Sequence, residues 1–77
     1  MQKPAGELVE LGNRIRAARK SAGLTQEDLA HESDIDRSYI GGVERGERNL
    51  TFTILCKIVR ALHCDVAALT KNLPPKP

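Results

Sequence analysis

Apolar residues recur every three or four positions in five short segments of this chain, and no segment shows the alternation of a β-strand. In the first segment, residues 7–22, Leu8, Leu11 and Ile15 fall on one face of the predicted helix, and Gly23 provides its C-terminal stop. The pattern therefore predicts an all-α fold, a compact arrangement of five helices.

Each of the other four predicted helices follows a residue whose side chain can cap a helix N-terminus. These residues are Thr25, Asp36, Thr51 and Asp65. The second helix is expected to bury Leu29 and Ala30, and the third to span residues 37–45 and stop at Gly46. Only about three residues separate these two helices, which is the spacing of a helix-turn-helix unit.

The length of 77 residues allows a single domain. We expect an N-terminal tail over residues 1–6, a folded domain over residues 7–70 and a flexible C-terminal tail over residues 71–77, where three prolines prevent a helix. The longest apolar run, Val66 to Leu69, is far too short to cross a membrane, and residues 1–7 lack a secretory signal. These features predict a cytoplasmic protein with no membrane partner.

The fourth predicted helix is apolar over an unusually wide arc of its circumference, which favours a second apolar partner beyond the core of one domain. A core this small, without disulfides, is also commonly stabilised by oligomerisation. We therefore predict a homodimer that forms through the last two helices. The candidate interface residues are Ile54, Ile58, Val66 and Leu69.

The sequence contains no recognisable catalytic or metal-binding pattern. Cys56, Cys64, His63 and His31 match no common zinc spacing, and both cysteines are interpreted as buried thiols. A nucleophilic site would also need an orienting group and an oxyanion loop, neither of which the sequence offers. We expect no enzymatic activity, no metal and no cofactor.

The second and third predicted helices resemble the helix-turn-helix of phage Cro and repressor proteins, the XRE family. The resemblance is carried by the segment Thr25-Gln26-Glu27-Asp28-Leu29-Ala30, by the short turn after it, and by Ile40, Val43 and Glu44 before a glycine. Residues 36–50, DRSYIGGVERGERNL, resemble the recognition segment of restriction–modification controller proteins. The resemblance extends from Leu11 to about Leu69. The family usually has glycine at the turn position that Asp34 occupies, so we expect a positive φ there.

This resemblance implies a lambda-repressor-like, sequence-specific transcriptional regulator that binds a pseudo-palindromic operator in double-stranded DNA as a dimer. Similar controllers regulate their own promoter and the expression of the restriction gene. For this chain we therefore expect a nucleoid-associated location in a bacterial cytoplasm, with RNA polymerase as a further candidate partner. A phage-type repressor or an antitoxin of the same fold is an alternative. A protein-interaction module that does not bind DNA is another.

The resemblance places Arg37, Ser38 and Tyr39 at the end of the third helix that enters the major groove. Their side chains suit base reading, since arginine can bond to guanine, serine can donate or accept, and tyrosine can also contact thymine methyl groups. The alternative is that Tyr39 packs against a neighbouring helix and Arg37 stays in water.

Contacts to the DNA backbone are expected from residues at the start of the second helix and after the third. They are Thr25, Gln26, Arg48 and Asn49. Arg48 could instead reach a base edge or the minor groove. The acidic residues around the second helix must then face away from the DNA.

Two features of the third helix need a further explanation. Glu44 lies on the same stripe as Ile40 and points inward, where the family resemblance suggests Arg19 as its partner; the alternative is that both are surface charges. Gly41 and Gly42 each cost about 1 kcal/mol relative to alanine. We interpret them as allowing close approach to DNA, although early termination of the helix would also explain them.

Overall fold

The computed structural model describes residues 5–76 and is all-helical over that range. Its five helices are α1 (Gly6–Ser21), α2 (Gln26–Ser33), α3 (Arg37–Glu44), α4 (Phe52–Ala61) and α5 (Val66–Thr70). The predicted fold class is thereby confirmed. Most of the predicted N-terminal tail, residues 1–4, lies outside the described residues, and α1 already begins at Gly6.

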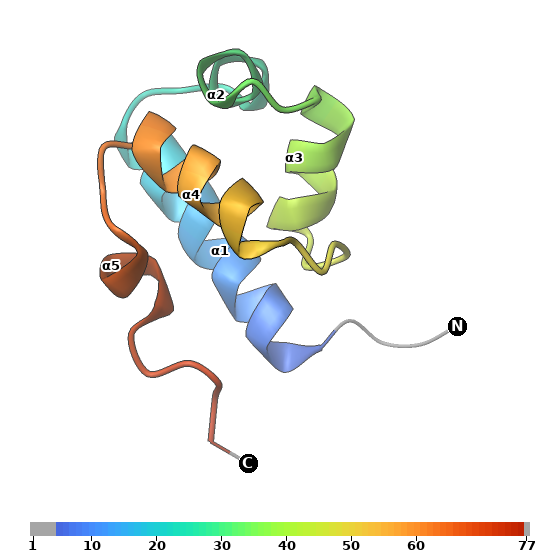
Figure 1. The fold of residues 1–77 in the computed structure, drawn as a ribbon, viewed down its shortest axis with the longest axis vertical. Helices are drawn as coiled ribbons and strands as arrows, with labels where there is room; N and C mark the ends of the chain where they lie inside the picture. The colour runs from blue at the N-terminus through green and yellow to red at the C-terminus, as the bar shows by residue number, and fades with distance from the viewer. Residues whose placement is uncertain (1–4, 77) are drawn as a thin grey trace.

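The helices are arranged around α1 and α4, with α3 and α5 on opposite sides of the molecule (Figure 1). α1 contacts both α3 and α5, while α4 contacts α2 and α5. The two helices of the predicted helix-turn-helix unit, α2 and α3, also pack against each other. This leaves the N-terminal end of α3 at the periphery of the molecule.

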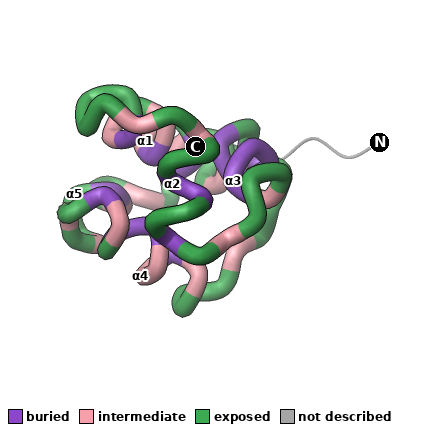
Figure 2. The backbone as a smooth tube through the Cα atoms, turned by 90° about the horizontal axis from the view of Figure 1, so that it is seen from above, coloured by how far each residue is buried: buried purple, intermediate pink, exposed green. Residues whose placement is uncertain are grey.

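One hydrophobic core holds all five helices together, and Figure 2 marks in purple the stretches of the backbone whose residues are buried. Ile15, Leu29, Ile40 and Ile58 are completely buried, one from each of the first four helices. The remaining buried apolar residues are Leu11, Ala30, Val43, Leu55, Val59, Leu62 and Leu69. Every helix thus contributes apolar side chains to one core, and their removal from water stabilises the arrangement of the helices.

The predicted caps are present at the starts of α2 to α5. The side chains of Thr25, Asp36, Thr51 and Asp65 each accept a hydrogen bond from a backbone N–H in the first turn. Thr25 and Asp28 also form a reciprocal capping box. At its other end α1 stops at Ser21, one residue before the predicted boundary, and Ala22 is exposed.

Gly12 sets the distance between α1 and the C-terminal end of α3. A β-carbon at this position would lie 2.4 Å from the carbonyl oxygen of Val43 and 2.7 Å from that of Glu44. Any side chain would therefore push the two helices apart. Gly12 fixes the position of α3, although nothing in the sequence pattern singles it out.

The chain after α5 is attached to the domain over its first residues. The Arg14 guanidinium donates to the carbonyl oxygens of Leu69 and Lys71, at 3.0 and 2.6 Å. The Leu73 side chain packs against the core. The beginning of the predicted flexible tail is therefore packed, because a leucine and an arginine from α1 provide contacts that the prolines do not prevent.

Candidate nucleic-acid interface

The turn between α2 and α3 places α3 across α2. Asp34 adopts φ 57°, the left-handed conformation expected at this position, and its N–H caps the end of α2. The Asp36 carboxylate then accepts hydrogen bonds from the backbone N–H and the hydroxyl of Ser38. These bonds lower the pKa of Asp36 from its ordinary value. The start of α3 is thus fixed by short-range contacts.

A buried ion pair holds the other end of α3. Arg19 from α1 donates from Nε to Oε2 of Glu44 at 2.6 Å and from Nη2 to Oε1 at 3.0 Å. The Glu44 side chain has no exposed surface, and that of Arg19 is 9% exposed. Both residues are therefore inside the fold, and the alternative of two surface charges does not apply.

Two further donors complete this cluster around Glu44. Gln26 donates from Nε2 to Oε1 at 3.1 Å, and Arg16 donates from Nε to the same oxygen at 3.4 Å. Burial raises the pKa of Glu44, but the bonds from Arg19, Gln26 and Arg16 outweigh it and lower the pKa below its usual value. The carboxylate is therefore held ionised, and it ties α1 and α2 to α3.

Arg16 was missed by sequence reasoning, although a signal for it existed. It precedes Arg19 by three residues, so the two side chains lie on one face of α1. The role of Gln26 also differs in part from the expectation of a backbone contact. Its amide bonds to Glu44 through Nε2, while Oε1 accepts from Nη1 of Arg37 at 3.4 Å.

The three residues expected to read bases differ in their surroundings. Arg37 and Ser38 are exposed, but the Ser38 hydroxyl donates to Asp36, so its oxygen remains available mainly as an acceptor. Tyr39 is half-buried and packs against the core, and the Arg48 guanidinium lies 5.1 Å from its ring centroid. The alternative that Tyr39 packs inside the protein therefore applies in part, since one portion of its side chain is covered by the core and another is accessible.

The residues expected to contact the DNA backbone lie at the edge of α2 and in the loop after α3. Thr25, Arg48 and Asn49 are exposed, and Gln26 is half-buried. The Thr25 hydroxyl accepts from the Asp28 N–H at 3.0 Å, which leaves its own proton free to donate to a phosphate. Arg45 is exposed in the same loop and pairs with Glu47 at 3.1 Å.

Helix α3 continues through both glycines to Glu44, so early termination does not explain them. A β-carbon at Gly42 would lie 3.0 Å from Cγ of Arg48. The space beside Gly42 is therefore filled by a side chain of the protein itself.

The proposed dimerisation surface contains only part of the predicted residues. Ile54 and Val66 are half-buried, whereas Ile58 and Leu69 belong to the core, with exposures of 0% and 5%. The latter two cannot offer area to a second chain, because the folding of one chain already buries them. Phe52, at the start of α4, is 67% exposed, although its helical spacing aligns it with the buried Leu55 and Val59.

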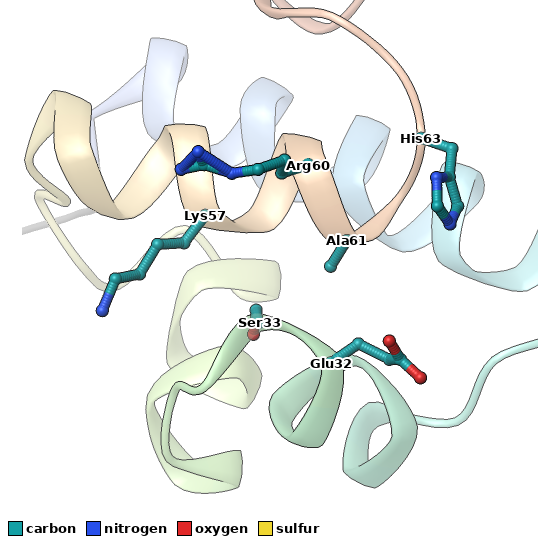
Figure 3. Close-up of a pocket in the computed structure, with 6 residues that line it drawn as sticks. All are labelled: Glu32, Ser33, Lys57, Arg60, Ala61 and His63. Atoms are coloured by element: carbon teal, nitrogen blue, oxygen red, sulfur yellow. The ribbon is translucent and has the colours of Figure 1, made fainter.

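A cavity of about 250 Å³ lies between α2 and α4, lined by Glu32, Ser33, Lys57, Arg60, Ala61 and His63 (Figure 3). Its polar groups do not converge: Lys57 extends away from the other lining residues, and the Ser33 hydroxyl donates to the Leu29 carbonyl at 2.6 Å. Within residues 5–76 no group of three metal-ligating side chains is found, and none of the described helices is long and apolar enough to cross a membrane.

Comparison with known proteins identifies the same segment of the chain. A helix-turn-helix family model matches residues 15–69, more than half of the chain. The control protein C.SmaI of Serratia marcescens is 42% identical over 59 residues, which are 77% of this chain and 70% of the relative.

Two solved structures of restriction–modification controller proteins are also similar. C.AhdI from Aeromonas hydrophila superimposes with a TM-score of 0.79 at 47% identity, covering 80% of this chain and 94% of that protein. C.Esp1396I, solved as a tetramer in complex with its natural 35 base-pair operator, gives a TM-score of 0.75 at 40% identity, covering 80% of this chain and 82% of that protein.

Proposed function

Because the chain belongs to the XRE-type helix-turn-helix family and is similar to restriction–modification controller proteins, we propose that it is a controller that binds operator DNA and regulates transcription. In this proposal a dimer binds a pseudo-palindromic site upstream of its own gene and the restriction gene. The proposal includes no catalytic step, and it places the protein in the cytoplasm, at the bacterial nucleoid.

One structural observation carries the proposal: the exposed N-terminal end of α3 is held rigidly by groups that are not themselves needed for contact with DNA. The buried Arg19–Glu44 pair fixes one end of α3, and the Asp36 cap fixes the other. Preorganised donors lose little conformational entropy on binding. The exposed Arg37 is therefore presented to the major groove at a defined position.

The roles proposed for single residues follow from this placement. Arg37, Ser38 and Tyr39 read bases, with Ser38 acting as an acceptor. Thr25, Gln26, Arg48 and Asn49 contact the backbone, which sets the register of the protein on the duplex. The structure adds a second task for Gln26, because its side chain bridges Glu44 and Arg37.

The proposed dimer forms through α4 and α5, where Ile54 and Val66 are half-buried and Phe52 is exposed, so all three retain apolar area for a second chain. Two copies related by a two-fold axis would place their α3 helices about 34 Å apart, one turn of DNA. Ile54→Asp should therefore convert the dimer to a monomer in analytical ultracentrifugation. Thr53→Asp, which adds the same charge at the exposed neighbouring position, should leave the dimer intact.

The function is tested by selection of binding sites from a random duplex library at about 150 mM salt, where nonspecific binding is weak. We expect enrichment of a pseudo-palindrome. Arg37→Ala should relax the preference at one position in each half-site, whereas Arg60→Ala, which removes the same charge beside the cavity between α2 and α4, should leave the selected sequence unchanged.

Two results would contradict the proposal. Folded, dimeric protein that enriches no sequence would favour a protein-interaction module instead. Equal effects of Arg37→Ala and Arg60→Ala would indicate binding through general charge and remove the base-reading role of α3. A phage-type repressor differs from a controller in its neighbouring genes, so adjacent restriction and methylation genes separate these two regulators.

A further inference from the structure

Gly42 lies beneath the side chain of Arg48. A β-carbon at Gly42 would approach Cγ of Arg48 to 3.0 Å, Nε to 3.1 Å and Cδ to 3.6 Å. The first two distances are shorter than ordinary van der Waals contact between a β-carbon and its neighbours. The arginine therefore lies against the bare backbone of α3, and a β-carbon at position 42 would force it to shift by a few tenths of an ångström.

The same arginine ends over an aromatic ring. Its guanidinium carbon is 5.1 Å from the centroid of Tyr39, within the range of a cation–π contact. Tyr39 and Gly42 are three residues apart and hence neighbours on one face of the helix. The Arg48 side chain thus runs along this face from Gly42 to Tyr39.

The loop after α3 brings Arg48 back toward the helix. The Glu47 N–H donates to the Gly42 carbonyl at 2.9 Å, and Gly46 turns the chain with φ 78°. A β-carbon at Gly46 would lie 2.7 Å from Cα of Val9, so this turn is packed against α1. The backbone that carries Arg48 is therefore fixed on both sides.

We propose that Gly42 is a positioning residue for DNA recognition, because its missing side chain forms a seat that holds Arg48 on the ring of Tyr39. The guanidinium and the phenol then meet the DNA as one preorganised unit, and the arginine loses less side-chain freedom on binding than a solvated one. This inference rests on the proposed function and assigns a structural reason to a glycine in mid-helix.

The neighbouring Gly41 provides a matched control. A β-carbon there would meet only the ends of two flexible side chains, Nη1 of Arg45 at 3.1 Å and Oε1 of Gln26 at 3.7 Å. Gly41→Ala and Gly42→Ala should therefore raise helix propensity equally. Only the second substitution occupies the seat of Arg48.

The first test needs no DNA. Tyr39 is the only tyrosine and the chain has no tryptophan, so its intrinsic fluorescence reports the surroundings of this ring alone. Stacking should also shift the NMR signals of the Arg48 methylene protons upfield. We expect Gly42→Ala and Arg48→Ala to change the tyrosine emission alike, and Gly42→Ala to abolish the upfield shifts. An unchanged emission and unchanged shifts in Gly42→Ala would refute the seat.

The second test measures affinity for the selected duplex. Gly42→Ala and Arg48→Ala should each weaken binding about tenfold, the effect of one lost contact, and the double variant should bind no worse than Arg48→Ala alone. Gly41→Ala, which raises helix propensity without touching Arg48, should leave the tyrosine emission and the Arg48 methylene shifts as they are in the wild type. Arg48→Lys keeps the charge but not the planar group, so it should also lose affinity without any change at position 42.

The outcomes separate this inference from the proposed function. Wild-type protein that binds no duplex would overturn the proposed function and the role of the seat in DNA binding, even if fluorescence and NMR showed Arg48 stacked on Tyr39. Specific binding by the wild type, with Gly42→Ala binding equally well, would overturn the inference alone. Additive losses in the double variant would also overturn it, because the glycine would then act independently of Arg48.

Discussion

Removal of Arg19 tests whether α3 is held in place by a buried charge. We consider Arg19→Met, which keeps most of the aliphatic bulk but removes the guanidinium that donates twice to Glu44. The Glu44 carboxylate, with no exposed surface, would keep only the weaker bonds from Gln26 and Arg16.

The expected cost follows from this geometry. Breaking a buried ion pair by removing one partner costs about 3–5 kcal/mol. Because two donors remain on Glu44, we expect the lower end, about 3 kcal/mol. A domain of this length has a free energy of unfolding of roughly 4–12 kcal/mol, so this loss removes between a quarter and three quarters of it and leaves roughly 1–9 kcal/mol. Its melting temperature should fall by roughly 12–24 °C.

Urea unfolding followed by far-UV circular dichroism at a fixed protein concentration measures this loss. The control is Arg45→Met, which breaks an exposed pair with Glu47 and should change the unfolding free energy by less than about 0.5 kcal/mol. The double variant Arg19→Met/Glu44→Leu should be more stable than Arg19→Met, because no unpaired charge stays buried. A loss below about 1 kcal/mol in Arg19→Met, or a double variant less stable than the single one, would refute this reasoning.

Three further predictions concern the stability of the fold. The pKa of Glu44 is lowered in the folded state, so the stability that its ionised carboxylate contributes is present above the ordinary pKa of 4.5 and is lost as the pH falls through the folded pKa. In Glu44→Gln the melting temperature should therefore fall less steeply as the pH is lowered through the acid range, and an unchanged pH dependence would contradict this role. Gly12→Ala should cost about 1–3 kcal/mol in urea unfolding, because the new methyl group meets the Val43 carbonyl, and full stability would contradict this contact. Asp34→Gly should stabilise by up to about 1 kcal/mol through relief of its positive φ, and a lower melting temperature would show that the aspartate is favoured there.

Local features of the fold were accessible from the sequence because they depend on residues a few positions apart. Caps at Thr25 and Asp36 involve N–H groups two or three residues on, and both are confirmed. The positive φ of Asp34 was expected from its place in the turn and is also confirmed. Such contacts form whenever the helix forms, whatever the remainder of the chain does.

The sequence alone thus determined the helices, their boundaries within a residue or two and the family. Tertiary structure decided which face of each helix meets which neighbour. It buries Ile58, which the periodicity had placed in the dimer interface, and it brings α1 so close to α3 that only glycine fits at position 12. It also joined Gln26 to Glu44 and laid Arg48 across Gly42. The physical reason is that periodicity specifies an apolar face but not its partner, since hydrophobic burial has no direction and only close packing selects the neighbours.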